Sequence, residues 1–200
     1  QMHKAIAVIQ FKLESQLFKK HPEWKMKDRC LFDHIVYRKG KVEIDGKEYD
    51  MTSCHFPTID PDNPDKLSEE EEILIQKLHH SFMVCEKLHK HIKVMLQHGC
   101  MYAIFNNNLL FHASCPLNED GSLKEVEIYP GKKFSGRALM HHTGMQIRTA
   151  FQSDSDPNEK EYAIDYSIYL CCGPASPPFA KSKMPTFERY FITDRRIIKK

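Results

Sequence analysis

The sequence lacks both a strong net charge and a long apolar run. Its 29 Lys and Arg residues are nearly balanced by 27 Asp and Glu residues, which leaves a formal net charge of +2 at pH 7. Such a balance gives no overall electrostatic field that points to nucleic acid. No apolar run approaches the roughly 20 residues that a membrane-spanning helix needs. We therefore expect no nucleic-acid partner and no contact with a membrane.

The sequence also lacks the cysteine spacings that are typical of disulfide-rich or zinc-binding proteins. Its seven cysteines are odd in number, and none of them belongs to a Cys-x-x-Cys pair. Cys171 and Cys172 are adjacent, and a vicinal pair seldom closes into a disulfide. Free thiols are typical of a reducing compartment, so we expect a cytoplasmic protein.

What the sequence does contain is typical of a folded domain. Hydrophobic residues make up 41% and charged residues 28% of the chain. Its 200 residues suffice to bury a core. Apolar positions at helical spacing predict a helix over 3–20, and a shorter helix is predicted over 26–35. Alternation around Asp45-Gly46 predicts a small surface hairpin over 41–51, apart from the main sheet, because that dipeptide favours a type I′ turn.

A long helix is predicted over residues 68–98. Ser68 followed by Glu71 matches the capping box, in which each side chain bonds the backbone amide of the other residue. Apolar residues then recur at helical spacing to the end of this range. We expect the helix to pack on a small sheet that contains residues 101–105 and 108–113.

The most informative stretch is MYAIFNNNLLFHASCPLNEDGS, residues 101 to 122. Its short apolar runs are bounded by turn residues, which predicts buried strands. His112 follows Leu109, Leu110 and Phe111, so it stands where a buried strand gives way to a loop. Such positions are where α/β sheets usually place their chemistry. His112 is therefore either a residue that binds metal or carries a proton, or a core histidine with one satisfied hydrogen bond, and both readings stay open.

A second polar position lies at a predicted helix entry. Ser135 and Gly136 permit a close approach of the backbone, and Arg137 follows at or near the first helical turn. A guanidinium beside free backbone amides can bind a phosphate group. The alternative is a surface ion pair, and the sequence alone favours neither.

Four blocks of the sequence resemble, in order, the class III fructose-1,6-bisphosphatases of bacteria. They are HKAIAVIQFKLES at 3–15, the stretch at 101–122, FSGRALM at 134–140 and MPTFERYFI at 184–192. That family belongs to the calcineurin-like metallophosphoesterases. The resemblance therefore implies an α-rich α/β fold, namely part of a calcineurin-like metallophosphoesterase sandwich with a long bracing helix and a separate small hairpin.

The resemblance also implies that the chain is an internal piece of a larger enzyme. The family's Asp-x-His, Gly-Asp-x-x-Asp, Gly-Asn-His and Gly-His motifs do not occur in the 200 residues. Residues 1–98 are then a mostly helical, insertion-like segment with a small hairpin, and residues 99–200 are part of the metallophosphatase catalytic domain. Both would be pieces of one larger domain, with the rest of the same polypeptide as their partner.

The activity implied by the resemblance is hydrolysis of the 1-phosphate of fructose 1,6-bisphosphate, which gives fructose 6-phosphate in gluconeogenesis. Divalent metal ions, manganese by family expectation, would be the cofactors, and His112 would be the lone metal-ligand histidine that ends a strand. Arg137, Lys181 and Arg189 are the cationic candidates for the sugar phosphates, in that order. The piece alone is expected to be inactive.

Two loops depart from the family's pattern. The family usually has Gly-Cys-Ile-Pro after the ligand histidine, where this chain has Ala113-Ser114-Cys115-Pro116. It favours Leu-Phe-Gly-Lys in a later loop, where this chain has Pro178-Phe179-Ala180-Lys181. Both loops could touch substrate, so the native sugar phosphate could differ.

The alternative function belongs to another class. In that reading the segment is a non-catalytic structural, regulatory or oligomerisation module. Its long helix and hairpin would mediate contacts with another subunit, and that subunit could be a second copy in a homo-oligomer. The two readings are separated by whether the missing metal-ligand motifs surround this stretch in the coding sequence.

Overall fold

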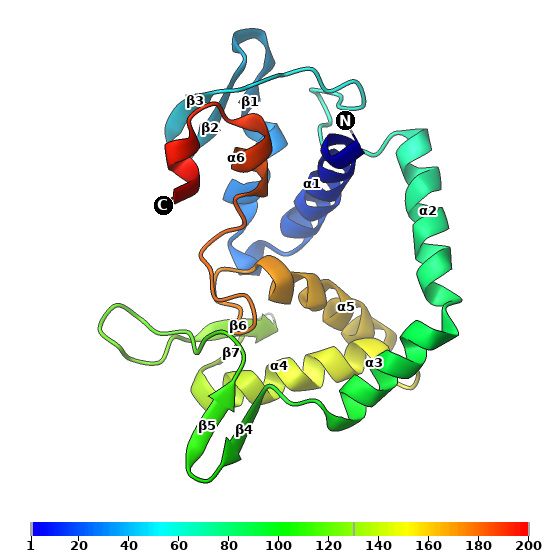
Figure 1. The fold of residues 1–200 in the computed structure, drawn as a ribbon, viewed down its shortest axis with the longest axis vertical. Helices are drawn as coiled ribbons and strands as arrows, with labels where there is room; N and C mark the ends of the chain where they lie inside the picture. The colour runs from blue at the N-terminus through cyan, green and yellow to red at the C-terminus, as the bar shows by residue number, and fades with distance from the viewer. Residues whose placement is uncertain (1, 130, 200) are drawn as a thin grey trace. The chain divides into compact units, whose positions relative to one another are not determined.

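The computed structural model describes residues 2–129 and 131–199, and the chain divides into two compact units (Figure 1). The first unit contains Gln1–Val84 and Met184–Lys200, and the second is the continuous stretch Cys85–Lys183. In sequence, the second unit is therefore inserted between two segments of the first. The division predicted after residue 98 concerned the domains of a longer enzyme and stays a prediction.

The predicted N-terminal helix is confirmed as α1 (Met2–Lys20). Its buried apolar residues, Ala7, Val8, Ile9 and Phe18, lie on more than one side of the helix. The helix ends before Pro22, because the residue that precedes a proline is pushed out of the α region; His21 has φ −119° and ψ 71°. One charged residue of this helix, Lys12, is also fully buried.

The short helix predicted over 26–35 is wrong. This region instead contains 3-10 turns and a short strand: η1 (Pro22–Trp24), η2 (Lys27–Arg29), η3 (Leu31–His34), β1 (Ile35–Val36) and η4 (Tyr37–Lys39). A segment this short gains little from cooperative helix formation. Burial of Leu31 and Phe32 in the core of the first unit favours the irregular path instead.

The hairpin predicted over 41–51 is confirmed as β2 (Lys41–Ile44) and β3 (Lys47–Asp50). Asp45 and Gly46 both have positive φ, as a type I′ turn requires. The hairpin also pairs antiparallel with β1, which gives the sheet order β1-β2-β3. The hairpin lies at the surface, as predicted, since Glu43 and most of β3 are exposed, while Val42 and Ile44 bury its other face in the core.

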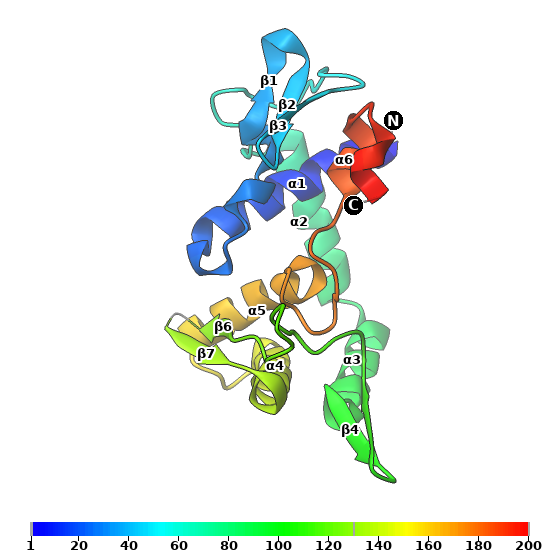
Figure 2. The same cartoon turned by 90° about the vertical axis from the view of Figure 1, so that its left-hand side faces the viewer.

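The core of the first unit joins residues from both ends of the sequence. Phe187 and Phe191 lie on α6 (Thr186–Phe191), which is followed by η5 (Arg195–Lys199). The ring of Phe11 on α1 makes an edge-to-face contact with Phe187, with centroids 5.6 Å apart. Figure 2 shows α6 next to α1. This aromatic cluster fixes the C-terminal segment to the first unit.

The single helix predicted over 68–98 is wrong, because the structure contains two helices, α2 (Glu69–Met83) and α3 (Glu86–His98). The break lies at Val84 and Cys85, and Cys85 has an extended backbone with φ −81° and ψ 90°. Both residues are weak helix formers. Tertiary packing does not hold α2 and α3 in one continuous helix. The predicted packing of this region on a sheet is also not seen for α2, where several apolar residues are exposed: Ile73, Leu74, Leu78 and Phe82.

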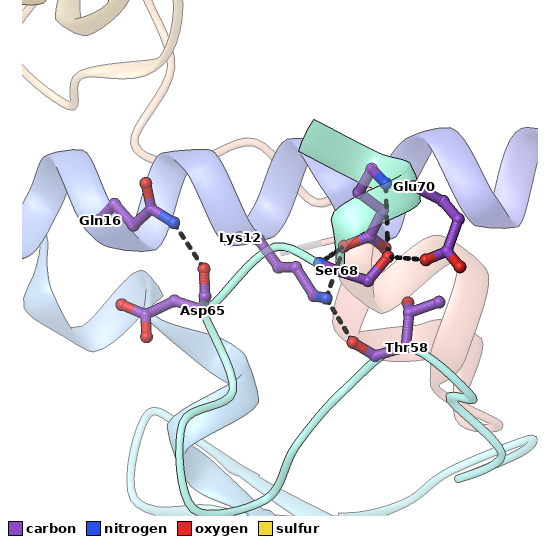
Figure 3. Close-up of polar contacts among 7 residues, drawn as sticks. Lys12, Gln16, Thr58, Asp65, Ser68 and Glu70 are labelled. Carbon is purple, nitrogen blue, oxygen red and sulfur yellow. Dashed lines mark hydrogen bonds and ion pairs between the residues drawn. The ribbon is translucent and has the colours of Figure 1, made fainter. Parts of the chain in front are cut away.

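The capping box predicted at Ser68 is confirmed. The Ser68 hydroxyl accepts a hydrogen bond from the Glu71 amide, and the Glu71 carboxylate accepts one from the Ser68 amide at 2.9 Å. Glu71 also forms a buried ion pair with Lys12, whose Nζ lies 2.7 Å from Oε2. Lys12 donates in addition to the carbonyl of Thr58, toward which it points in Figure 3. This cluster fixes the start of α2 to α1.

The second unit contains α3, two hairpins and a pair of helices. The hairpins are β4 (Tyr102–Phe105) with β5 (Asn108–Phe111), and β6 (Val126–Tyr129) with β7 (Lys132–Phe134). The helices α4 (Gly136–Phe151) and α5 (Pro157–Cys172) pack side by side (Figure 1). Their contact buries Leu139, Ala163 and Tyr166 completely.

The strands predicted at 101–105 and 108–113 are confirmed as β4 and β5, although β5 ends at Phe111. They form a two-stranded sheet of their own, so the hairpin at 41–51 lies in a different sheet, as predicted. The combination of helices with small antiparallel sheets confirms the α-rich α/β class. Within residues 2–129 and 131–199, no helix has both the length and the apolar character needed to cross a membrane.

Candidate functional site

His112 lies in a bend that directly follows β5, and its side chain is exposed. Among the described residues His112 is therefore not part of a core, and the core-histidine alternative for the complete protein stays a prediction. The next residue, Ala113, has φ +67°, a left-handed conformation that costs a residue with a Cβ roughly 1–2 kcal/mol. The backbone thus turns sharply after His112 and leaves the imidazole accessible.

The strand that leads to His112 is not buried, contrary to the sequence prediction. All four residues of β5 are exposed, and the exposed fractions of Leu109 and Leu110 are 57% and 55%. The reason is that the hairpin has two strands and neither of its faces is covered by the part of the chain that the structure describes. An apolar run predicts burial only where a second layer exists to bury it.

Arg137 begins α4 and lies beside the base of the same hairpin. Its Nε donates a hydrogen bond to the Tyr102 hydroxyl at 2.9 Å. Tyr102 is paired across the hairpin with Phe111, the residue before His112. Arg137 and His112 are therefore anchored to the same end of the β4-β5 hairpin. Among the described residues Arg137 has no acidic partner, so the surface ion pair considered as an alternative is wrong.

The backbone before Arg137 requires glycine. Gly136 has φ +50°, and a Cβ at this position would lie 2.8 Å from Cδ1 of Leu123. The absence of a side chain thus allows the start of α4 to approach the loop that follows His112. Ser135 occupies the N-cap position without a side-chain hydrogen bond to the helix, so its hydroxyl does not compete for the amides there.

Lys181 lies in the loop that follows α5, and its side chain is exposed. This loop is tied to the segment after His112: the Ser114 amide donates to the Pro177 carbonyl at 3.0 Å, and the Ser114 hydroxyl donates to the same oxygen at 3.3 Å. Ala180, directly before Lys181, has φ +53°. The two loops that depart from the family's pattern are therefore in contact, and each contains an alanine in the left-handed region.

Arg189, the third cationic candidate, belongs to the first unit, whereas His112, Arg137 and Lys181 belong to the second. It lies on α6 in the first unit, and its side chain is exposed. Its carbonyl accepts a hydrogen bond from the Arg195 guanidinium. The candidate site of the second unit thus consists of His112, Arg137 and Lys181.

The sequence analysis missed two residues that organise this site, Tyr102 and Ser114. Tyr102 positions Arg137 although 35 residues separate them, and Ser114 bonds a carbonyl 63 residues away. Tertiary contacts of this kind leave no local pattern in the sequence. The one signal in the sequence is that Tyr102 and Ser114 each have a hydroxyl group within or close to an apolar strand.

His142 on α4 is a further imidazole in this unit that the sequence analysis did not select. Its ring lies against Phe134, with centroids 3.7 Å apart. Burial lowers the pKa of His142, and the neighbouring His141 and Lys132 lower it further. Its Nδ1 has no hydrogen-bond partner among the described residues.

The described residues do not form a complete metal site. Within residues 2–129 and 131–199, no group of three or more His, Cys, Asp or Glu side chains is arranged to hold a metal ion. His112 offers one accessible imidazole, which suits a ligand of manganese or zinc but cannot hold a divalent ion by itself. Any metal bound at His112 needs further ligands from outside the described residues.

An apolar pocket of about 310 Å³ lies between α3 and α4. Its walls include Ile92 and Met95 of α3 and Ile147 and Phe151 of α4. The guanidinium of Arg148 lines it as well, but that group donates hydrogen bonds to backbone carbonyls, one of them Gly99 at 2.8 Å. The pocket is therefore mainly apolar, and the one guanidinium that lines it already bonds two backbone carbonyls.

The comparisons with known proteins identify the family. The sequence profile of the Firmicute fructose-1,6-bisphosphatase family matches residues 1–200. A protein of Phocaeicola vulgatus named fructose-1,6-bisphosphatase class 3 is 48% identical over 200 residues, which are 100% of this chain and 30% of that protein. Proteins of the same name from Bacteroides fragilis and Clostridium novyi are 49% identical over 199 residues and 48% identical over 194 residues.

The match covers nearly all of this chain but a minor part of each relative. The shares are 100% of the chain and 30% of the Bacteroides fragilis protein, and 97% of the chain and 29% of the Clostridium novyi protein. No solved structure matches the chain. Since the family profile spans the whole sequence, the chain belongs to the Firmicute fructose-1,6-bisphosphatase family.

Proposed function

We propose that this chain is part of a longer calcineurin-like, metal-dependent phosphatase of the cytoplasm that removes the 1-phosphate of fructose 1,6-bisphosphate. Its product would be fructose 6-phosphate, in gluconeogenesis. The observation that carries the proposal is the family profile, which matches the whole sequence. The geometry supports it further, because His112, Arg137 and Lys181 lie on segments of one unit that are joined by hydrogen bonds.

The role proposed for His112 is to supply one ring nitrogen to a metal ion. Divalent ions, manganese by family expectation, would supply a polarised phosphoryl group and an activated water when bound. The imidazole fits this role because it is exposed and because the backbone turns away directly behind it at Ala113. Carboxylate ligands would come from the rest of the polypeptide.

The role proposed for Arg137 and Lys181 is to bind the phosphates of the substrate. The Nε of Arg137 donates a hydrogen bond to the Tyr102 hydroxyl. This bond leaves the two terminal nitrogens of the guanidinium for a bidentate contact with a phosphate. Lys181 supplies a compact charge from the loop that is hydrogen-bonded to the segment after His112. Two cations in the unit that contains His112 suit a substrate that carries two phosphates.

Substitution of His112 in the complete protein tests the proposal. We expect His112→Ala to reduce manganese content and to lower turnover of fructose 1,6-bisphosphate by orders of magnitude. Its melting temperature should hardly change, because an exposed side chain contributes little to stability. The matched control is His98→Ala, which removes another exposed histidine, at the end of α3. Partial rescue by excess manganese would support ligation.

Normal metal content and normal turnover in His112→Ala would remove this residue from the mechanism. A loss of activity in both the His112 and the His98 variants would point to a general effect on the fold. Mass spectrometry of bound metals, phosphate release and thermal unfolding are therefore measured on the same preparations.

The 200-residue chain by itself should hydrolyse no fructose 1,6-bisphosphate and should bind manganese weakly. The reason is that the described residues offer no group of three metal ligands. Titration calorimetry with MnCl₂ and a phosphate-release assay check both statements. Turnover by the purified chain at a rate that His112→Ala abolishes would contradict the incomplete-site reading.

A second function, as an oligomerisation module, is favoured by one observation. Leu74, Leu78 and Phe82 recur at helical spacing on α2, and each is more than two-fifths exposed. Such a stripe can form a helix–helix contact with another subunit. Analytical ultracentrifugation of the complete protein and of its Leu78→Glu variant tests it: an unchanged molecular mass would exclude a subunit contact through α2.

A further inference from the structure

Two alanines of the second unit adopt a backbone conformation that is rare for alanine. Ala113 has φ +67° and Ala180 has φ +53°. Among the described residues of this unit, the other non-glycine residues with positive φ are Asn106 and Asn107, in the turn of the β4-β5 hairpin. Asparagine tolerates this region because its short polar side chain can bond locally. Alanine has no such side chain, so the structure around each alanine must hold it there.

Each strained alanine lies next to a residue of the candidate site. Ala113 directly follows His112, and Ala180 directly precedes Lys181. The dihedral angles of each alanine set the direction in which the chain continues, and with it the direction of the neighbouring site residue. Strain of this kind is concentrated at functional sites, where the surrounding structure over-determines it. A return of either alanine to an ordinary conformation would therefore move His112 or Lys181.

Ser114 makes the contact that holds the first of these loops. Its amide and its hydroxyl both donate to the carbonyl oxygen of Pro177, at 3.0 Å and 3.3 Å. Figures 1 and 2 both show the segment after β5 beside the loop after α5. The β4-β5 pairing holds the chain before His112, and the two Ser114 bonds hold it after Ala113. The conformation of Ala113 is therefore determined from both sides.

The loop that accepts these bonds is itself fixed to α5. The ring of Pro177 restricts its own φ. The residue before it, Ser176, is 2% exposed, and its hydroxyl donates to the Leu170 carbonyl in α5 at 2.7 Å. The Ala180 amide donates to the Ser176 carbonyl at 3.3 Å. This loop is thus a rigid point of attachment for the segment that contains Ser114.

We propose that Ser114 is a positioning residue for the site of the proposed phosphatase. Its two bonds to the Pro177 carbonyl hold the strained backbone at Ala113. They thereby fix the span between His112 and Lys181. A fixed span favours one separation between the phosphate at the metal and the second phosphate, so Ser114 acts on substrate selection without touching substrate. The inference rests on the proposed function for the roles of His112 and Lys181, whereas the contact between the loops does not.

Substitution of Ser114 in the complete protein tests its role. Ser114→Ala removes the hydroxyl bond, and the manganese concentration for half-maximal turnover of fructose 1,6-bisphosphate should rise about twofold to tenfold, the equivalent of one net hydrogen bond. Ser114→Thr keeps a hydroxyl and should restore the wild-type value. An unchanged manganese requirement in Ser114→Ala would overturn the inference.

The matched control is Ser167→Ala. The Ser167 side chain is also half-buried, and its hydroxyl also donates to a carbonyl, that of Ala163 at 2.9 Å, but this bond lies within α5. Both alanine variants should lose a similar amount of thermal stability, because each loses one such bond. A change in the manganese requirement that is confined to Ser114→Ala therefore reports the position of His112 rather than folding. Equal changes in both variants would contradict a positioning role.

Relief of the strain distinguishes a positioning contact from an ordinary loop contact. Glycine adopts positive φ as readily as negative φ, so Ala113→Gly removes the strain that the Ser114 bonds oppose. When it is added to Ser114→Ala, we expect it to recover about half or more of the rise in manganese requirement, on a logarithmic scale, which a double-mutant cycle measures. If the added glycine increases the requirement further, flexibility rather than strain governs this backbone and the inference is wrong.

Hydrogen exchange gives a readout that needs no activity and no metal. In the complete protein, peptides that cover 110–116 and 174–182 should exchange faster together in Ser114→Ala, because each loop loses the same contact. Neither peptide should change in Ser167→Ala. Unchanged exchange of both peptides in Ser114→Ala would overturn the inference. A wild-type protein that shows this coupling but hydrolyses no fructose 1,6-bisphosphate would refute the proposed function and leave the contact between the loops established.

Discussion

Breaking the buried ion pair between Lys12 and Glu71 should strongly destabilise the first unit. Lys12 is fully buried and Glu71 is 7% exposed, and 2.7 Å separates Nζ from Oε2. In Lys12→Met the aliphatic stem is kept, but Glu71 remains as a buried carboxylate without its cation. Removal of one partner of a buried pair costs about 3–5 kcal/mol. The Thr58 carbonyl loses its donor as well, which adds about 1 kcal/mol.

The assay follows the single tryptophan of the sequence. Trp24 is buried in the first unit and stacks on His21, so its fluorescence in a urea titration reports unfolding of that unit. The control is Lys19→Met on the same helix. Lys19 pairs with Asp33 and Asp65 but is 34% exposed, and such a pair contributes at most about 1 kcal/mol.

A double substitution tests the physical reason for the loss. In Lys12→Met with Glu71→Gln no charge remains buried, and glutamine can still accept the hydrogen bond from the Ser68 amide in the capping box. The double variant should therefore be more stable than Lys12→Met alone. The reasoning would be refuted if Lys12→Met cost no more than the Lys19 control, or if the double variant were the less stable of the two.

Two further predictions concern pH and backbone strain. Burial raises the pKa of Glu71, but hydrogen bonds from Lys12 and from the Ser68 amide outweigh burial and lower the pKa overall. The stability that Glu71 contributes is therefore fully present above its unfolded pKa of about 4.3 and is lost as the pH falls through its folded pKa. Urea titrations between pH 6 and pH 3 should show this loss, and the double variant should show less of it. Ala113→Gly should leave the free energy of unfolding unchanged or raise it by up to about 1 kcal/mol, because glycine adopts positive φ without strain. An alanine-to-glycine substitution usually lowers stability, so a melting temperature that falls by several degrees would contradict this prediction.

Local patterns in the sequence predicted the parts of the fold that local physics determines. The Asp45-Gly46 turn and the capping box of Ser68 each depend on residues within three or four positions of one another. The prediction of one helix over 68–98 failed where local signals are weakest. Neither Val84 nor Cys85 is a glycine or a proline, so no helix-breaking residue marks the break. The spacing of apolar residues does not describe the backbone conformation there.

The candidate site could be predicted only in part, because its residues are assembled by contacts between distant segments. His112 and Arg137 were selected for their position at the end of a strand and at the start of a helix, and both positions are confirmed within one residue. Their common anchor, Tyr102, was not predictable, because nothing in MYAIF distinguishes a tyrosine that bonds an arginine from one that fills a core. The contact between Ser114 and Pro177 was hidden for the same reason.

The exposed hairpin and the proposed metal-binding role of His112 both require residues beyond those that the structure describes. The apolar faces of β4 and β5 lack a covering layer, and His112 lacks further ligands among the residues described. A carboxylate ligand is stable beside apolar strands only where it is paired with a metal or a cation. Under the role proposed for His112, removal of the segment that carries these carboxylates from the complete protein should abolish manganese binding, which metal analysis of the shortened protein measures.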